Sequence, residues 1–341
     1  MNRKSAKKAI RLTLTFVMVL VFSSGSMQEV FAASGGTYQV PTKIKETYYG
    51  SNGVKDTTTH TLKYNKKGLL IIWRRSEGRK IIYTRDKKTG GIKKEVLYRV
   101  KKTDAKNTYK VNRKGLPVSG KLDTGQSYKM TYKKGKLKKV RFDNMETTTF
   151  YTNGHKKKYV YNDKSDPDTK TLIKYDSHGS QIYLRDYTGI RKYACTYNEQ
   201  GDLTRCVEKQ KKKDKYVDSA TTDIGYDYDS AGRIIKARQV KRNKGDDYKT
   251  VETFTYSYNN KGSVTKVVYT SKEVYDDGTV NTGTKYVTKL KYKTVKVAKK
   301  YRRLVYDRVW RIDPKNPVYW DEQAPFGERL EITAPLYPYM W

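Results

Sequence analysis

A short motif for a tight hairpin turn recurs along the chain and limits its fold more than any other feature. Six segments carry Tyr or Val, then Asn or Asp, two variable residues and Gly. The Asx side chain accepts a hydrogen bond from the backbone two residues on, and the Gly takes a positive φ that a side chain resists. Each segment therefore predicts a three-residue hairpin loop. The six Asx and Gly pairs are Asn65 and Gly68, Asn112 and Gly115, Asp176 and Gly179, Asn198 and Gly201, Asp229 and Gly232, and Asn259 and Gly262.

The loop also predicts which residues face each other across the two strands. The Tyr before the Asx lies opposite the apolar residue after the turn, and such an aromatic-aliphatic contact is worth roughly 0.2–1 kcal/mol. Looser copies of the motif end at Gly135, Gly154 and Gly278. The predicted pairs are Tyr64 with Leu70, Tyr197 with Leu203, Tyr228 with Ile234, and Tyr258 with Val264.

The segment from Tyr286 to Val297 alternates as a half-buried strand should. Tyr286, Thr288, Leu290 and Tyr292 occupy one face, and Lys289, Lys291 and Lys293 occupy the other. The hydrophobic fraction is only 36%, and 32 tyrosines supply much of it, which is typical of thin, half-exposed sheets. We predict an all-β fold: an antiparallel meander of hairpin repeats over 33–296 that forms a curved or spiralling sheet, followed by a last strand and cap over 297–341.

These units resemble tyrosine-aspartate (YD) repeats, which build the shells of Rhs-type bacterial proteins and of teneurins. They are most similar to short secreted proteins with a few such repeats, and the likeness covers about residues 60–270. The resemblance implies a β-meander that spirals or curls, with tyrosines stacked along it. This chain is too short to close a large shell, has no Asp-Pro-rich core motif followed by a toxin, and is rich in lysine. Toxin encapsulation therefore does not carry over.

The N-terminus has the pattern of a secretory signal peptide. A basic stretch from Arg3 to Arg11 precedes an apolar run from Leu12 to Phe22, and Val30 and Ala32 supply small residues for cleavage after Ala32. The apolar run is shorter than the ~20 residues that a membrane-spanning helix needs. We therefore expect residues 1–32 to be removed, leaving an extracellular bacterial protein, free or associated with the cell wall, with no membrane span.

The charge of the chain favours anionic partners. The formal net charge is +38, and residues 1–32 contain five positive charges and one negative charge, so their removal leaves +34. A field of this sign attracts polyanions such as anionic cell-wall polymers and acidic extracellular polysaccharides. Export argues against a dedicated nucleic-acid role. In the alternative interpretation, the lysines only keep the sheet soluble and prevent pairing between sheet edges.

Residues 310–341 differ from the repeats. They hold three of the four tryptophans, Trp310, Trp320 and Trp341, among five of the eight prolines. The segment is expected to cap the end of the repeat array. Alternatively, it binds sugars or a protein partner through its aromatic rings. The candidate binding residues are Lys289, Lys291, Lys293, Tyr292, Trp310, Trp320 and Trp341.

No pattern in the sequence indicates catalysis. The three histidines, His60, His155 and His178, lie outside any metal-binding or catalytic motif, and adjacent acids such as Asp276 and Asp277 match turn chemistry. We therefore expect no enzyme activity, cofactor or metal, and predict a binding or adhesion module. The alternatives are a scaffold that acts through protein partners and, less favoured, a carbohydrate-active enzyme.

The two cysteines, Cys195 and Cys206, flank one predicted hairpin in a compartment that permits disulfides. A type I turn with Gly201 as a left-handed bulge would pair Asn198 with Asp202 and put the cysteines on opposite faces. A two- or four-residue loop would set them side by side. The faces depend on the turn, and we expect no bridge.

Overall fold

The computed structural model describes residues 36–305, apart from 51–52, 101, 124, 135, 144, 153–155 and 163–169. These residues form twenty strands and one 3₁₀ helix, η2 (Lys299–Leu304). The strands are β1 (Thr37–Tyr49), β2 (Lys55–Tyr64), β3 (Leu70–Arg75), β4 (Arg79–Arg85), β5 (Ile92–Arg99), β6 (Lys102–Val111), β7 (Pro117–Lys121), β8 (Ser127–Lys133), β9 (Lys136–Phe142), β10 (Glu146–Phe150), β11 (Lys156–Tyr161), β12 (Thr171–Tyr175), β13 (Gln181–Asp186), β14 (Gly189–Tyr197), β15 (Leu203–Lys212), β16 (Lys215–Tyr228), β17 (Ile234–Asn243), β18 (Tyr248–Tyr258), β19 (Val264–Tyr275) and β20 (Val280–Lys296).

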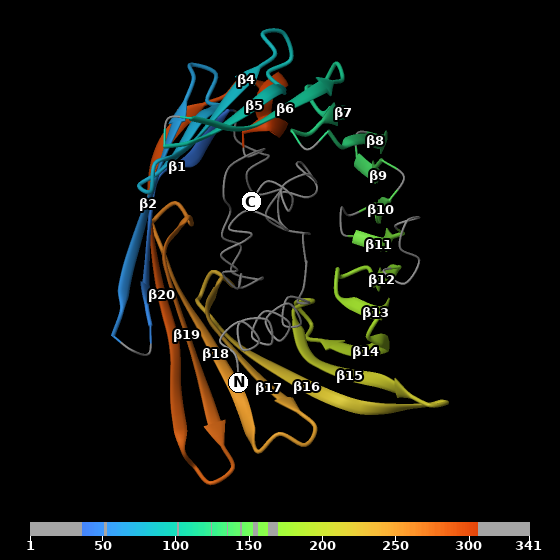
Figure 1. Ribbon diagram of the computed structural model, residues 1–341. Coiled ribbons are helices and arrows are strands. Elements are labelled where there is room, and N and C mark those ends of the chain that lie inside the picture. The colour runs from blue at the N-terminus through green and yellow to red at the C-terminus, as the bar shows by residue number, and fades with distance from the viewer. Residues whose placement is uncertain are drawn as a thin grey trace.

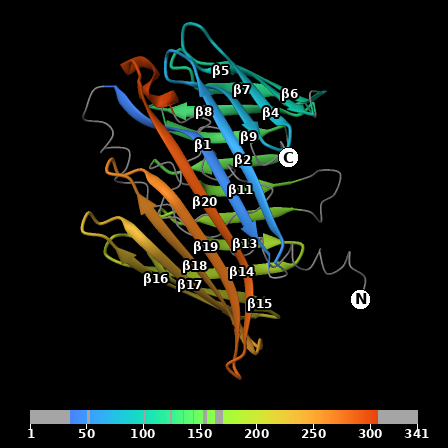
Figure 2. The same cartoon turned by 90° about the vertical axis from the view of Figure 1, so that its left-hand side faces the viewer.

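The strands form one closed antiparallel sheet. Each strand pairs with its neighbour in chain order, and β20 pairs with β1 along almost the whole length of β1. Figure 1 shows the resulting ring, and Figure 2 shows it from the side, with β1, β2 and β20 toward the viewer. The predicted antiparallel meander is confirmed, but the predicted open, curved or spiralling sheet is wrong. Closure gives both end strands a partner and removes two exposed edges.

The predicted hairpin turn is confirmed in its hydrogen bonds. The Asn65 side chain accepts from the backbone N–H of Lys67 at 2.9 Å and of Leu69 at 3.0 Å, and Gly68 has a φ of 73°. The other five Asx side chains also accept from the N–H four residues on, at 2.8–3.1 Å. All four predicted cross-strand pairs occur: Tyr64 with Leu70, Tyr197 with Leu203, Tyr228 with Ile234, and Tyr258 with Val264.

Each of these turns is followed by a β-bulge. Lys63 pairs with Ile72 whereas Tyr64 pairs with Leu70, so Ile71 is an extra residue in the second strand. The same one-residue shift occurs beside the other five turns. A bulge leaves part of the ladder unpaired and increases the local twist, which helps a sheet to curve.

Tyrosine hydroxyl groups join one hairpin to the next at these bulges. The Tyr258 hydroxyl donates to the carbonyl oxygen of Ile234 at 2.6 Å. Other tyrosines make the same kind of bond: Tyr226 to Leu203 at 3.0 Å, Tyr292 to Val264 at 2.7 Å, and Tyr132 to Pro117 at 2.8 Å. The tyrosine ring thus covers apolar surface while its hydroxyl satisfies a backbone acceptor, which accounts for the frequent use of this residue.

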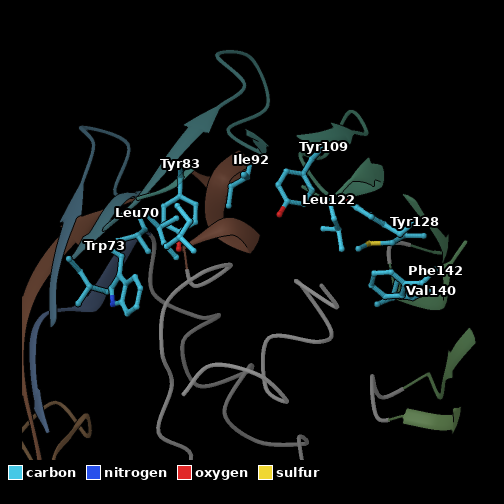
Figure 3. Packing of buried hydrophobic residues seen from close by; sticks show 14 of the residues in the cluster. Leu70, Trp73, Tyr83, Ile92, Tyr109, Leu122, Tyr128, Val140 and Phe142 are labelled. Carbon is cyan, nitrogen blue, oxygen red and sulfur yellow. The ribbon is translucent and has the colours of Figure 1, made fainter. Parts of the chain in front are cut away.

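The apolar face of the sheet lies inside the ring. Figure 3 shows Trp73, Tyr83, Tyr109, Tyr128 and Phe142 pointing inward from β3, β4, β6, β8 and β9, and all five are buried. Ile44 of β1 and Leu290 of β20 belong to the same cluster, so the core continues across the junction of the two end strands. Alternate residues therefore face outward, and the outer face carries most of the lysines.

Residues 297–305 cover the turns of three hairpins. Val297, Tyr301 and Leu304 are buried against the turns after β2, β4 and β6. A Cβ atom on Gly68 would lie 2.6 Å from Val297 Cγ2, and one on Gly115 would lie 2.8 Å from Leu304 Cδ1. This part of the predicted C-terminal cap therefore packs closely on the repeats.

Two further predictions fall on other parts of the chain. The signal peptide over 1–32 and the tryptophans Trp310, Trp320 and Trp341 lie outside the described residues. Among the residues that are described, no helix has the length and hydrophobicity needed to cross a membrane.

Candidate functional site

Closure of the sheet brings lysines from three strands together on its outer face. Lys289 of β20 pairs with Lys45 of β1 on one side and with Lys266 of β19 on the other. Lys291 of β20 pairs with Lys43 of β1. All five side chains are exposed, and we call them the seam lysines. Side chains directly opposite each other have Cβ atoms about 5 Å apart.

The predicted row on β20 is part of this surface. Lys289, Lys291 and Lys293 are all exposed, whereas Thr288 and Leu290 are buried. The sequence analysis missed Lys43, Lys45 and Lys266, because they reach the row only through pairing with β20. Their alternation with the buried residues Ile44 and Val267 is the local signal that places them on an outer face.

The seam lysines are uncompensated. Within the described part of the chain, none of their five ammonium groups makes a hydrogen bond or an ion pair. By contrast, Lys209 lies 3.8 Å from the Asp218 carboxylate, and Lys236 lies 3.8 Å from the Asp227 carboxylate. Like charges directly opposite each other destabilise a sheet, so the seam lysines lower stability without an internal counter-charge.

Tyr292 lies on the other face of β20. Its hydroxyl donates to the Val264 carbonyl oxygen at 2.7 Å, and its ring packs against the inner core. The candidate binding residue Tyr292 therefore does not share a surface with the candidate lysines of β20. Lys293 has a different aromatic neighbour, because its Nζ lies 5.2 Å from the ring centroid of Tyr64.

The inner face carries charged residues that the sequence analysis did not identify. Arg191 Nε lies 3.7 Å from Glu208 Oε1, and Glu252 accepts hydrogen bonds from the Tyr269 hydroxyl at 2.6 Å and from Gln239 at 2.9 Å. Burial raises the pKa of Glu252, although the Tyr269 hydrogen bond opposes this. Alternation of Glu252 with Phe254 and Tyr256 in the sequence is a signal that could have placed it inside.

Lys241 also points inward, from β17. It pairs across the sheet with Thr222 and Thr250. Burial lowers the pKa of its ammonium group, while the carboxylates of Glu208 and Glu252 oppose this shift.

The described residues contain no group of three or more His, Cys, Asp or Glu side chains that could hold a metal ion. Arg191 and Lys241 have the carboxylates of Glu208 and Glu252 near them, whereas the seam lysines have no such partner in the described part of the chain.

Cys195 and Cys206 face each other directly across β14 and β15. Their sulfur atoms are 3.0 Å apart, and both thiols are free. The turn forms as expected, with Gly201 left-handed, but the cysteines do not fall on opposite faces as that turn was expected to place them. The bulge at Thr204 shifts the register by one residue and brings them together. Their mutual hydrogen bond and burial raise the pKa of the Cys206 thiol.

Comparison with known proteins yields remote structural likenesses. No family model and no curated protein matches the chain. A porin-like protein from Bacteroides uniformis is 13% identical over 74% of this chain and 96% of its own, with a TM-score of 0.27. A protein of unknown function from the DUF3598 family of Nostoc punctiforme is 9% identical over 78% of this chain and 100% of its own, with a TM-score of 0.15. Function must therefore be argued from the chain itself.

Proposed function

We propose that this chain is an exported, non-catalytic binding module, related in its repeats to YD proteins, that holds anionic cell-wall or extracellular polymers on its outer face. The observation that carries the proposal is the alignment of Lys45, Lys289 and Lys266 on three adjacent strands with no counter-charge. A bound polyanion would supply that charge.

The energetics support an external ligand. Mutual repulsion among the seam lysines opposes closure of the sheet, since β1 and β20 are the two strands that must meet. A ligand that binds only the closed ring and neutralises these charges would stabilise the fold by mass action. The same surface would attract the polymer from a distance, because its charges have one sign.

Export is supported by the signal-peptide pattern over 1–32. It predicts that the protein recovered outside the producing bacterium begins at Ala33. N-terminal sequencing of protein from the culture medium and from the washed cell wall tests this. Recovery of an uncleaved chain from the cytoplasm alone would contradict the proposal.

The binding function is tested by measuring attachment of the purified chain to isolated cell walls and to purified anionic wall polymer across a salt series. We expect attachment at low salt that weakens steadily as salt rises, because the interaction is electrostatic and exposed. Neutral polysaccharide is the control. Absence of binding at low salt would refute the polyanion function, and salt-insensitive attachment would favour a protein partner instead.

A further inference from the structure

Lys293 and the four seam lysines of β20 and β1 form two short parallel rows along the strands. On β20, Lys289, Lys291 and Lys293 occupy alternate positions and are separated by about 6.8 Å, given the ~3.4 Å rise per residue of an antiparallel strand. On β1, Lys43 and Lys45 form a second row, one strand spacing of about 4.8 Å away. A linear anion lying along the junction of β20 and β1 would meet an ammonium group at each step.

This spacing selects among polyanions. Two residues of an extended peptide contain six backbone bonds, and a phosphodiester chain with three carbons between phosphates also has six bonds in each repeat. The two chains therefore extend by nearly the same length per repeat, roughly 7 Å. Successive phosphates of such a polymer can meet successive lysines, whereas a polymer with longer linkers loses register after the first contacts.

We propose that Lys293 and the seam lysines of β20 and β1 bind a phosphodiester polymer of short polyols, with three carbons between phosphates, laid along these two strands. This inference rests on the proposed polyanion function and specifies its ligand class. Lys289, Lys291 and Lys293 contact successive phosphates, and Lys43 and Lys45 contact the same chain from the neighbouring strand.

A single-stranded nucleic acid has the same number of backbone bonds per repeat, but the surface suits it less well. Binding of single strands normally uses aromatic rings on which bases stack. Tyr286 and Tyr292 face the inside of the ring, away from the lysines. Tyr49 lies on the outer face beyond Thr47, and its ring is already approached by the ammonium groups of Lys55 at 5.8 Å and Lys285 at 5.7 Å.

The test uses synthetic oligomers with about ten phosphates each and a fluorescent end label. One has propanediol linkers, the second has hexanediol linkers, and the third is oligothymidylate. Affinities for the full chain are measured by fluorescence anisotropy at several salt concentrations. We expect the propanediol oligomer to bind at least about tenfold more tightly than the hexanediol oligomer, and no less tightly than oligothymidylate.

A variant locates the binding site. Lys289→Gln/Lys291→Gln/Lys293→Gln should abolish the preference for propanediol and reduce the slope of log K against log salt by about 2, since each phosphate contact on a single strand contributes about 0.7. The control, Lys174→Gln/Lys192→Gln/Lys209→Gln, removes the same charge from β12, β14 and β15 and should keep the preference. Circular dichroism checks that both variants fold.

The outcomes separate this inference from the proposed function. Equal binding of the propanediol and hexanediol oligomers would overturn the spacing argument and leave a general polyanion surface. Tighter binding of oligothymidylate would replace the polyol phosphate with nucleic acid. If none of the oligomers binds at low salt, both the inference and the proposed function fail.

Discussion

Two regions of the ring use the same hairpin in different surroundings. The closure region comprises β1–β7, β19, β20 and η2, and the far arc comprises β11–β17. In the closure region, the turn glycines Gly68 and Gly115 pack under the C-terminal segment. In the far arc, a Cβ on Gly201 or Gly232 would meet no described atom within 4 Å.

The lysines differ in the same way. In the far arc, Lys174 lies 5.1 Å from the ring centroid of Tyr183, and Lys192 lies 4.1 Å from that of Tyr216. Lys192 and Lys209 face each other, but each has a partner of its own. The seam lysines face each other with none. The repeat thus specifies the hairpin. The residues around each lysine determine whether its charge on the outer face is neutralised.

The largest expected difference between the two regions is in polymer binding. Lys45→Gln/Lys266→Gln/Lys289→Gln should weaken binding to anionic wall polymer about 100-fold at ~0.1 M salt, because three positive charges of the seam are lost. Lys174→Gln/Lys192→Gln/Lys209→Gln changes the net charge equally and should weaken it only a few-fold. Titration of both variants against labelled polymer measures this, and equal losses would show that net charge alone governs binding.

A disulfide between Cys195 and Cys206 would give the far arc a covalent cross-link that the closure region does not have. Oxidised glutathione should convert Cys195 and Cys206 to a disulfide: the thiols give up two protons and two electrons, and glutathione is reduced. The closed loop is short, so the bridge should raise the free energy of unfolding by up to about 3 kcal/mol. Mass spectrometry and urea denaturation measure both effects.

Cys206→Ser is the control for this prediction and should show no change in stability with oxidant. If the oxidised protein keeps both thiols accessible to alkylation after unfolding, the two sulfur atoms do not react and the prediction is wrong.

Substitution of a turn glycine should lower the free energy of unfolding more in the closure region than in the far arc. Gly201→Ala should cost about 1 kcal/mol, because Ala resists the left-handed backbone that Gly201 adopts with a φ of 79°. Gly68→Ala has the same backbone penalty and adds a clash with Val297, so it should cost about 2 kcal/mol more. Urea denaturation measures both variants. Equal losses would mean that the C-terminal segment does not press on the turn.

The smallest expected effect concerns the inner face. Because burial raises the pKa of Glu252 above its usual 4.5, the folded protein holds this proton to higher pH than the unfolded chain does. The free energy of unfolding should therefore fall as pH rises above about 4.5, by on the order of 1 kcal/mol. Glu252→Gln should remove this part of the pH dependence. Thermal unfolding of both proteins from pH 4 to 8 measures it, and identical profiles would contradict the assignment.

The local structure was predictable because its causes are local. The pairing of Tyr64 with Leu70 follows from the turn between them, and the two faces of β20 follow from alternation of Leu290 with Lys289 and Lys291. The closed ring was not predictable in this way. It depends on the pairing of Thr37–Tyr49 with a strand at the far end of the chain, and no short-range pattern encodes that register.

The candidate site was predictable only in part for the same reason. Lys289, Lys291 and Lys293 stand in one segment, but Lys43 and Lys45 join them only after closure. The cysteine pair shows how a small local detail can reverse a prediction. One extra residue, Thr204, moved Cys206 to the face of Cys195 although the turn itself was as expected.

The closed antiparallel ring also restricts how such a gene can change in length. Neighbouring strands must run in opposite directions all the way round, so the number of strands has to be even. Loss of one strand would leave β1 and β20 parallel where they meet, whereas loss of a whole hairpin would leave a smaller ring with its junction intact. Evolution of this architecture should therefore proceed by duplication and deletion of strand pairs. The hairpin is then the smallest unit that can be gained or lost without breaking the closed ring.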